Sequence, residues 1–209
     1  MNRFFVLAVR NEISGAVVGP ESGTKYSLSN ACNACGTGAN VTGRFFVSDR
    51  NFRHPVLCFS SGGSIVHDSL AAEFKALGVK SLHEVWKNDE KLDYFQIEGQ
   101  EILPPFSPIS KYFTWDLHCQ ACRRDGFFCQ KEPLKLIYPS LPLRFSRHHV
   151  LATHEGFGYS FLREPFSQSH FAEPLLIVSE EIKGIFQGAK IDGVEFFPVV
   201  IEHFAEDSA

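Results

Sequence analysis

The sequence has little methionine and no long apolar run. Met occurs once in 209 residues, and no stretch approaches the roughly 20 consecutive apolar residues of a transmembrane helix. The apolar run at residues 4–9 ends at Arg10, so it falls short of the about 7–15 residues of a secretory signal. We therefore expect no membrane association. We predict a cytoplasmic protein whose first strand is residues 3–10.

The chain also lacks an excess of positive charge. Its formal net charge is −4 and its pI about 6.1, whereas nucleic-acid binders neutralise phosphates with Lys and Arg. Two local basic clusters, Arg123–Arg124 and residues 144–149, are interpreted as solvated surface. The charge therefore argues against nucleic acid as a partner.

Catalytic motifs are missing as well. The sequence has no Gly-x-Gly-x-x-Gly loop, Walker loop or nucleophile elbow. A stretch with His148, His149, His154 and Glu155 carries metal-binding and acid–base side chains. It lacks the His-Glu-x-x-His spacing that puts two ligands on one helical face, so we interpret these as surface or packing residues. We assign no catalytic residue and predict that the protein is not an enzyme.

What is present is the composition of a globular protein. Apolar residues make up 44% of the chain and charged residues 21%, which is typical of soluble domains. Phe occurs 21 times and forms four doublets, which place one ring on each face of a strand. We predict a single α+β domain over residues 1–209, with mixed sheets and few helices. A division into two sub-domains, 1–100 and 101–209, is the alternative.

Two segments have the pattern strand–helix–strand. In the first, Asp68 or Ser69 is expected to cap the helix, and Gly78 is expected to end it in a left-handed conformation. In the second, Ser179 is the predicted cap, and residues 194–201 return as a strand. Apolar positions of the two segments match at an offset of 112 residues: Ile65/Ile177, Val66/Val178, Leu70/Ile182, Phe74/Phe186, Val79/Ile191 and Leu82/Val194. Shared binary patterning explains this match, and a true internal repeat is the other interpretation.

Two Cys-x-x-Cys pairs, Cys32–Cys35 and Cys119–Cys122, are the strongest chemical signal. Each pair supplies two thiolates from one tight turn, and four thiolates complete the tetrahedral coordination of a structural zinc ion. The spacing between the pairs is far beyond that of a compact zinc ribbon. The pairs therefore predict one zinc ion that joins two distant loops and leaves no coordination position open for catalysis.

Other interpretations of the cysteines remain open. The two pairs can lack metal, or they can have a disulfide or redox role, although a reducing cytoplasm favours metal. His118 and Cys129 are candidate replacement ligands, but four cysteines in two matched pairs need none. Cys58 lies in an apolar run and is predicted to be a small buried hydrophobic residue.

Three features together resemble the Myxococcus-type paralogous family of double-CXXCG motif proteins. They are Cys32-x-x-Cys35-Gly36, then Cys119-x-x-Cys122 followed by Asp125–Gly126–Phe127, and the closing segments 176–179 and 193–196. The closing segments are also similar to immunity-protein domains of bacterial polymorphic toxin systems. The order of these features spans nearly the whole chain. Arg123 stands where the second family motif has Gly, and this departure concerns the backbone there more than the ligands.

The resemblance implies a cytoplasmic immunity protein that binds and neutralises a cognate toxin domain, with zinc purely structural. A basic toxin would complement the acidic chain, but the sequence defines no binding face. The alternative function is a zinc-ribbon-like, nucleic-acid-associated protein, which the net charge disfavours. An enzyme that uses the Cys or His cluster is a further alternative.

Overall fold

The computed structural model describes residues 3–13, 18–48, 52–59, 63–129, 134–157 and 174–206. Within these ranges the chain combines mixed sheets with two α-helices, α1 (Asp68–Ala76) and α2 (Glu180–Gly188), and two 3-10 helices, η1 (Gly19–Ser22) and η2 (Leu143–Arg147). The predicted α+β class with few helices is confirmed. None of the described helices has the length and apolar character needed to cross a membrane.

Two large sheets and two small ones contain the strands. The first large sheet has the order β12 (Ile137–Pro142), β16 (Val194–Ala205), β1 (Phe4–Val9), β15 (Leu176–Ser179), β13 (Val150–Ala152). The second has the order β2 (Glu12–Ile13), β6 (Val56–Phe59), β7 (Ser64–His67), β9 (Glu90–Ile97), β8 (Leu82–Lys87), β5 (Phe45–Phe46). The small sheets are β10 (Phe113–His118), β11 (Asp125–Cys129), β14 (Gly156–Phe157), and β3 (Tyr26–Ser27) with β4 (Asn40–Val41).

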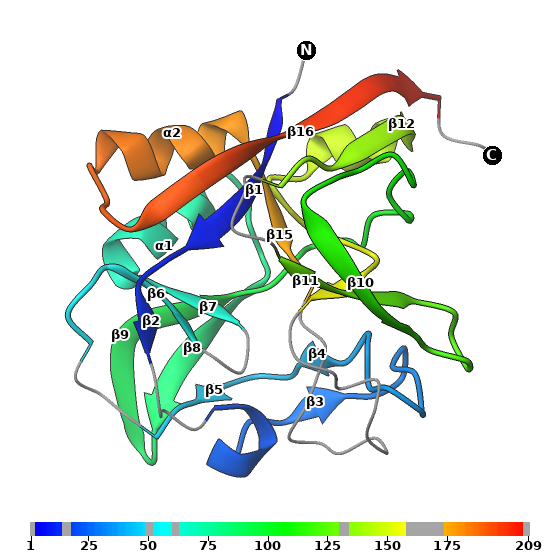
Figure 1. Ribbon diagram of the computed structural model, residues 1–209. Coiled ribbons are helices and arrows are strands. Elements are labelled where there is room, and N and C mark those ends of the chain that lie inside the picture. Colours follow the sequence, from blue (N-terminus) through cyan, green and yellow to red (C-terminus); the bar gives the residue numbers. More distant parts are fainter. Residues whose placement is uncertain are drawn as a thin grey trace.

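Each large sheet contains one split β-α-β unit. Strands β7 and β8 flank α1 in the sequence, and both pair antiparallel with β9. Strands β15 and β16 flank α2 in the same way, and both pair antiparallel with β1. The two helices lie side by side over these units at the upper left of Figure 1.

The helix starts differ in part from the prediction. The cap of α1 is His67 rather than Asp68 or Ser69, because Asp68 already has helical backbone while the His67 Nδ1 accepts the Ser69 N–H at 3.3 Å. The predicted cap of α2 is confirmed, since Ser179 Oγ accepts the Ile182 N–H at 3.4 Å. Gly78 also has the expected left-handed conformation, with a φ of 83°.

The match at an offset of 112 residues extends to the three-dimensional structure. After a shift of 112 residues, β7 has the same bounds as β15, and α1 has the same bounds as α2. Strands β8 and β16 also begin at equivalent residues. The helices also end alike: Gly78 N–H bonds to Lys75 O and Lys190 N–H to Gln187 O, at 2.9 and 3.1 Å. The two segments are therefore structural repeats and share more than a pattern of apolar residues.

Strands β1 and β9, each of which pairs with both strands of one unit, are exchanged between the two units. Strand β1 precedes the first unit in the sequence but lies in the sheet of the second, whereas β9 precedes the second unit and lies in the sheet of the first. Their registers correspond, because Phe5 faces Val178 as Phe95 faces Val66. When the chain is divided into two halves between β8 and β9, each half contributes its first strand to the sheet of the other half. Figure 1 shows this for the dark-blue β1, which lies between β15 and β16.

The central core lies between the two units and is built from equivalent residues. Phe74 of α1 meets Phe186 of α2 edge to face, with ring centroids 5.5 Å apart. Further equivalent pairs buried in this core are Val56/Val150, Val66/Val178, Leu70/Ile182, Phe95/Phe5 and Ile97/Leu7. The contact between equivalent residues indicates an approximate two-fold axis that passes between the helices. Separate apolar clusters cover the opposite face of each sheet.

Candidate metal centre

The four predicted cysteines meet at one point in the fold. The sulfur atoms of Cys32, Cys35, Cys119 and Cys122 all lie within 4.8 Å of one another, and the described residues contain no other His, Cys, Asp or Glu group of this kind. Cys32 Sγ is 3.8 Å from Cys119 Sγ, and Cys35 Sγ is 3.7 Å from Cys122 Sγ. A tetrahedron with zinc–sulfur bonds of about 2.3 Å has sulfurs about 3.8 Å apart, so these two separations fit such an ion. None of the four forms a disulfide.

Both cysteine turns are held by the same backbone hydrogen bonds. In the first turn the Gly36 N–H bonds to Cys32 O at 2.8 Å, and the Cys32 N–H to Thr37 O at 2.9 Å. In the second, the Arg123 N–H bonds to Cys119 O at 2.8 Å, and the Cys119 N–H to Arg124 O at 2.9 Å. The two turns are equivalent at an offset of 87 residues, and the equivalent sulfurs lie 3.8 and 3.7 Å apart.

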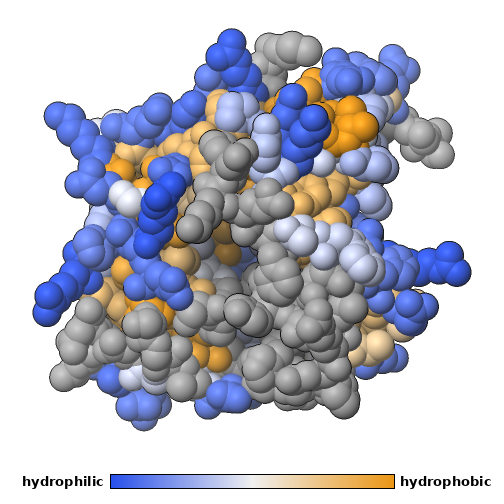
Figure 2. Space-filling model, viewed as in Figure 1, coloured by the Kyte–Doolittle hydropathy of each residue, from blue (hydrophilic) through white to orange (hydrophobic). Residues whose placement is uncertain are grey.

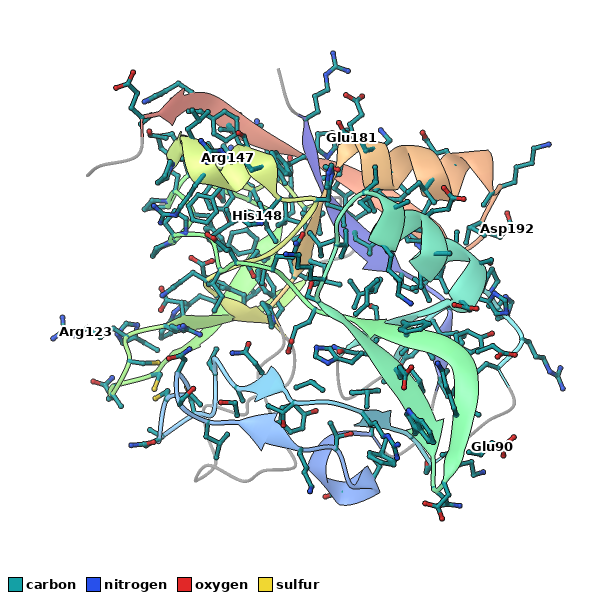
Figure 3. All side chains as sticks on the ribbon, turned by 180° about the vertical axis from the view of Figure 1, so that it is seen from behind. Glu90, Arg123, Arg147, His148, Glu181 and Asp192 are labelled. Atoms are coloured by element: carbon teal, nitrogen blue, oxygen red, sulfur yellow. The ribbon has the colours of Figure 1, made fainter. Side chains whose placement is uncertain are left out.

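Arg123 adopts the backbone conformation that its position requires. Its φ is 59°, and the φ of the equivalent Gly36 is 72°. This left-handed region is easily reached by glycine and costs a residue with a Cβ roughly 1 kcal/mol or more. The side chain points away from the molecule (Figure 3), so it does not obstruct the turn. The second turn thus forms without the glycine that follows the first cysteine pair.

Local groups change the acidity of the thiols. Burial raises the pKa of Cys32, but backbone N–H groups of Ala34 and Cys35 and the neighbouring thiols outweigh it and lower the pKa to about 7. Burial, helped by the Cys119 and Cys32 thiols, raises the pKa of Cys122. Four thiols this close cannot all become thiolates without a cation, because each added charge repels the others. A bound metal ion would supply that charge.

Further contacts hold the hairpins that carry the turns. Thr37 Oγ1 lies 3.1 Å from Cys35 Sγ. On the second hairpin, Asp125 Oδ1 accepts the Trp115 Nε1–H at 3.1 Å and lies 2.9 Å from His118 Nδ1. His118, a candidate ligand from the sequence, therefore bonds across β10 and β11 and is not in the sulfur cluster. Thr37 and Trp115 could not be predicted from the sequence, because neither lies in a metal-binding motif.

The other singled-out residues lie apart from this centre. Cys58 is half-buried and donates its thiol to Val9 O at 3.2 Å. Cys129 ends β11, but its side chain is outside the described part of the chain. His148 pairs with Glu101 at 3.2 Å, and His149 Nδ1 lies 2.9 Å from Ser179 Oγ. The histidine-rich stretch is thus divided among separate contacts.

Comparison with known proteins adds no assignment. No protein-family model matches the chain, and no curated protein matches it either.

Proposed function

We propose that Cys32, Cys35, Cys119 and Cys122 hold one structural zinc ion. The observation that carries this is the convergence of four sulfurs from two equivalent turns. A set of four thiolates favours zinc among the common divalent ions. Four sulfurs also fill a tetrahedral shell, so the ion would join the β3–β4 and β10–β11 hairpins and would not bind a reacting water.

We propose that the protein, with its two hairpins joined by the metal ion, is an immunity protein. It would bind a cognate toxin domain and neutralise it in the cytoplasm. The resemblance of the chain's motifs to the double-CXXCG family, and of the closing segments to immunity-protein domains, supports this role. A metal-joined scaffold is also suited to holding a binding surface in one shape, because ordering costs paid before binding do not weaken the complex.

Co-expression tests the role directly. A bacterial host that produces the toxin encoded beside this chain is expected to grow when the chain is present and to stop growing without it. The two proteins should then co-purify as a stable complex. The matched control is the Cys58→Ser variant, which keeps all four proposed ligands and should protect the host fully. Absence of both rescue and complex, with the chain folded and zinc-loaded, would rule the role out.

A further inference from the structure

A cavity of about 230 Å³ lies beside the metal centre, between the two halves of the fold. Its walls include the equivalent pairs Leu7/Ile97 and Cys58/Ala152, so it lies close to the approximate two-fold axis. The segment 36–41 that leaves the first cysteine turn forms one wall, and Arg124 of the second turn contributes another. The volume is large enough for a small molecule and is not needed by the proposed metal site.

Gln96 is a polar residue at a position that is apolar in the other half. The registers of β9 and β1 make it the equivalent of Val6, which is fully buried in an apolar cluster. Gln96 is only 6% exposed, and its Nε2–H₂ donates to Ile97 O at 3.0 Å. Its Oε1 is fully enclosed and has no hydrogen-bond partner among the described residues. Gln96 contributes a polar side chain to the cavity wall, but its enclosed Oε1 is not open to a ligand there.

Two charged residues line the same cavity, and only one of them is already paired. The Glu98 carboxylate accepts the Val41 N–H at 3.0 Å and pairs with His83 at 3.1 Å. Arg124, the equivalent of Thr37, lies near enough to Glu155 to oppose a small part of the rise that burial causes in the pKa of that carboxyl, but among the described residues its guanidinium is in no ion pair within 4 Å. The cavity therefore offers one cation to a ligand and little free negative charge.

Apolar side chains form part of the remaining walls. They include Phe45, Phe59, Phe157 and Leu176. Apolar lining with a few placed polar groups is the usual composition of a small-molecule site. From the aromatic side chains in the walls and from Arg124, which is in no ion pair among the described residues, we propose that this cavity binds a small aromatic carboxylic acid. The carboxylate pairs with Arg124.

Calorimetric titration of the zinc-loaded full chain with indole-3-acetate tests this. The probe has an aromatic body and a carboxylate, and binding to the unmodified protein is expected. Arg124→Gln should weaken binding at least tenfold, since it removes the charged partner of the carboxylate. Ser64→Leu should abolish binding, because it places in the cavity wall the side chain that the other half has at Leu176.

Matched controls keep the outcome clear. Arg123→Gln alters the adjacent, outward-pointing arginine and should bind the probe as the unmodified protein does. Indole-3-acetamide, without the carboxylate charge, should bind weakly to the unmodified protein and equally weakly to Arg124→Gln. The proposal is overturned if the unmodified protein does not bind indole-3-acetate, or if Arg124→Gln and Ser64→Leu, with unchanged thermal unfolding, bind it as tightly. Neither outcome bears on toxin neutralisation.

Discussion

Gly36 and Arg123 occupy equivalent positions directly after the two cysteine pairs, and both have a left-handed backbone, with φ of 72° and 59°. The same relationship recurs at the helix ends, where Gly78 has a φ of 83° and the equivalent Lys190 a φ of 52°. In both cases the first half has glycine and the second half has a long basic residue. The second half therefore carries backbone strain that the first half avoids.

Replacing Arg123 with glycine should stabilise the protein. The substitution removes the Cβ from a left-handed position, and we expect the free energy of unfolding to rise by about 1 kcal/mol, less the greater freedom of glycine in the unfolded chain. Denaturant unfolding of the zinc-loaded protein measures this. Arg123→Ala is the control and should give no gain, because it keeps the Cβ. Equal stability of the Gly and Ala variants would show that the position is not strained.

Metal analysis of the pure protein should give one zinc per chain. The Cys122→Ser variant should lose the metal and become less stable by several kcal/mol, because structural zinc binding contributes on the order of 10 kcal/mol and is coupled to folding. Cys58→Ser should keep the metal. A Cys122→Ser variant as stable as the parent would contradict the site.

Glu155 should make stability depend on pH. Burial raises the pKa of this carboxyl from its ordinary value to about 7, and Glu155 is 4% exposed. Its folded-state pKa is higher than its unfolded one, so the stability it contributes is complete at low pH and is lost as pH rises through about 7. Between pH 6 and 8 we expect a fall of about 1 kcal/mol in the free energy of unfolding.

Glu155→Gln should remove this fall. The amide oxygen can still accept the Phe106 N–H that Glu155 Oε1 accepts at 3.0 Å, and the amide carries no charge. The exposed Glu202 provides the control, since Glu202→Gln should leave the pH dependence unchanged. Parallel pH profiles for the parent and Glu155→Gln would show that another group is responsible.

The contact between the two helices should be energetically coupled. Phe74→Leu and Phe186→Leu are each expected to lower the free energy of unfolding by about 1–3 kcal/mol. The double variant should lose less than the sum by about 0.5–1.5 kcal/mol, because the edge-to-face pair is removed only once. Phe74→Leu combined with Phe157→Leu, whose ring lies in a different apolar cluster, should be additive. Additivity of the first pair would contradict the contact.

Local sequence patterns predicted much of this fold. The two helices lie where apolar stripes, a Ser179 cap and Gly78 place them, and the 112-residue match corresponds to a structural repeat. The predicted cap of α1, Asp68 or Ser69, was wrong because the imidazole nitrogen of His67 accepts the hydrogen bond that a Ser or Asp side chain usually accepts. The cavity and Gln96 left no signal, since a single buried glutamine in a strand has no motif.

The sequence by itself determined the candidate metal ligands and the two strand–helix–strand units, because spacing and periodicity act over a few residues. Only the tertiary structure decided that β1 and β9 exchange sheets and that the four sulfurs meet. It also decided that Arg123 accepts a conformation suited to glycine. These outcomes depend on contacts between residues about 90 positions apart, which are selected by the packing of a shared core and not by any local preference of the chain.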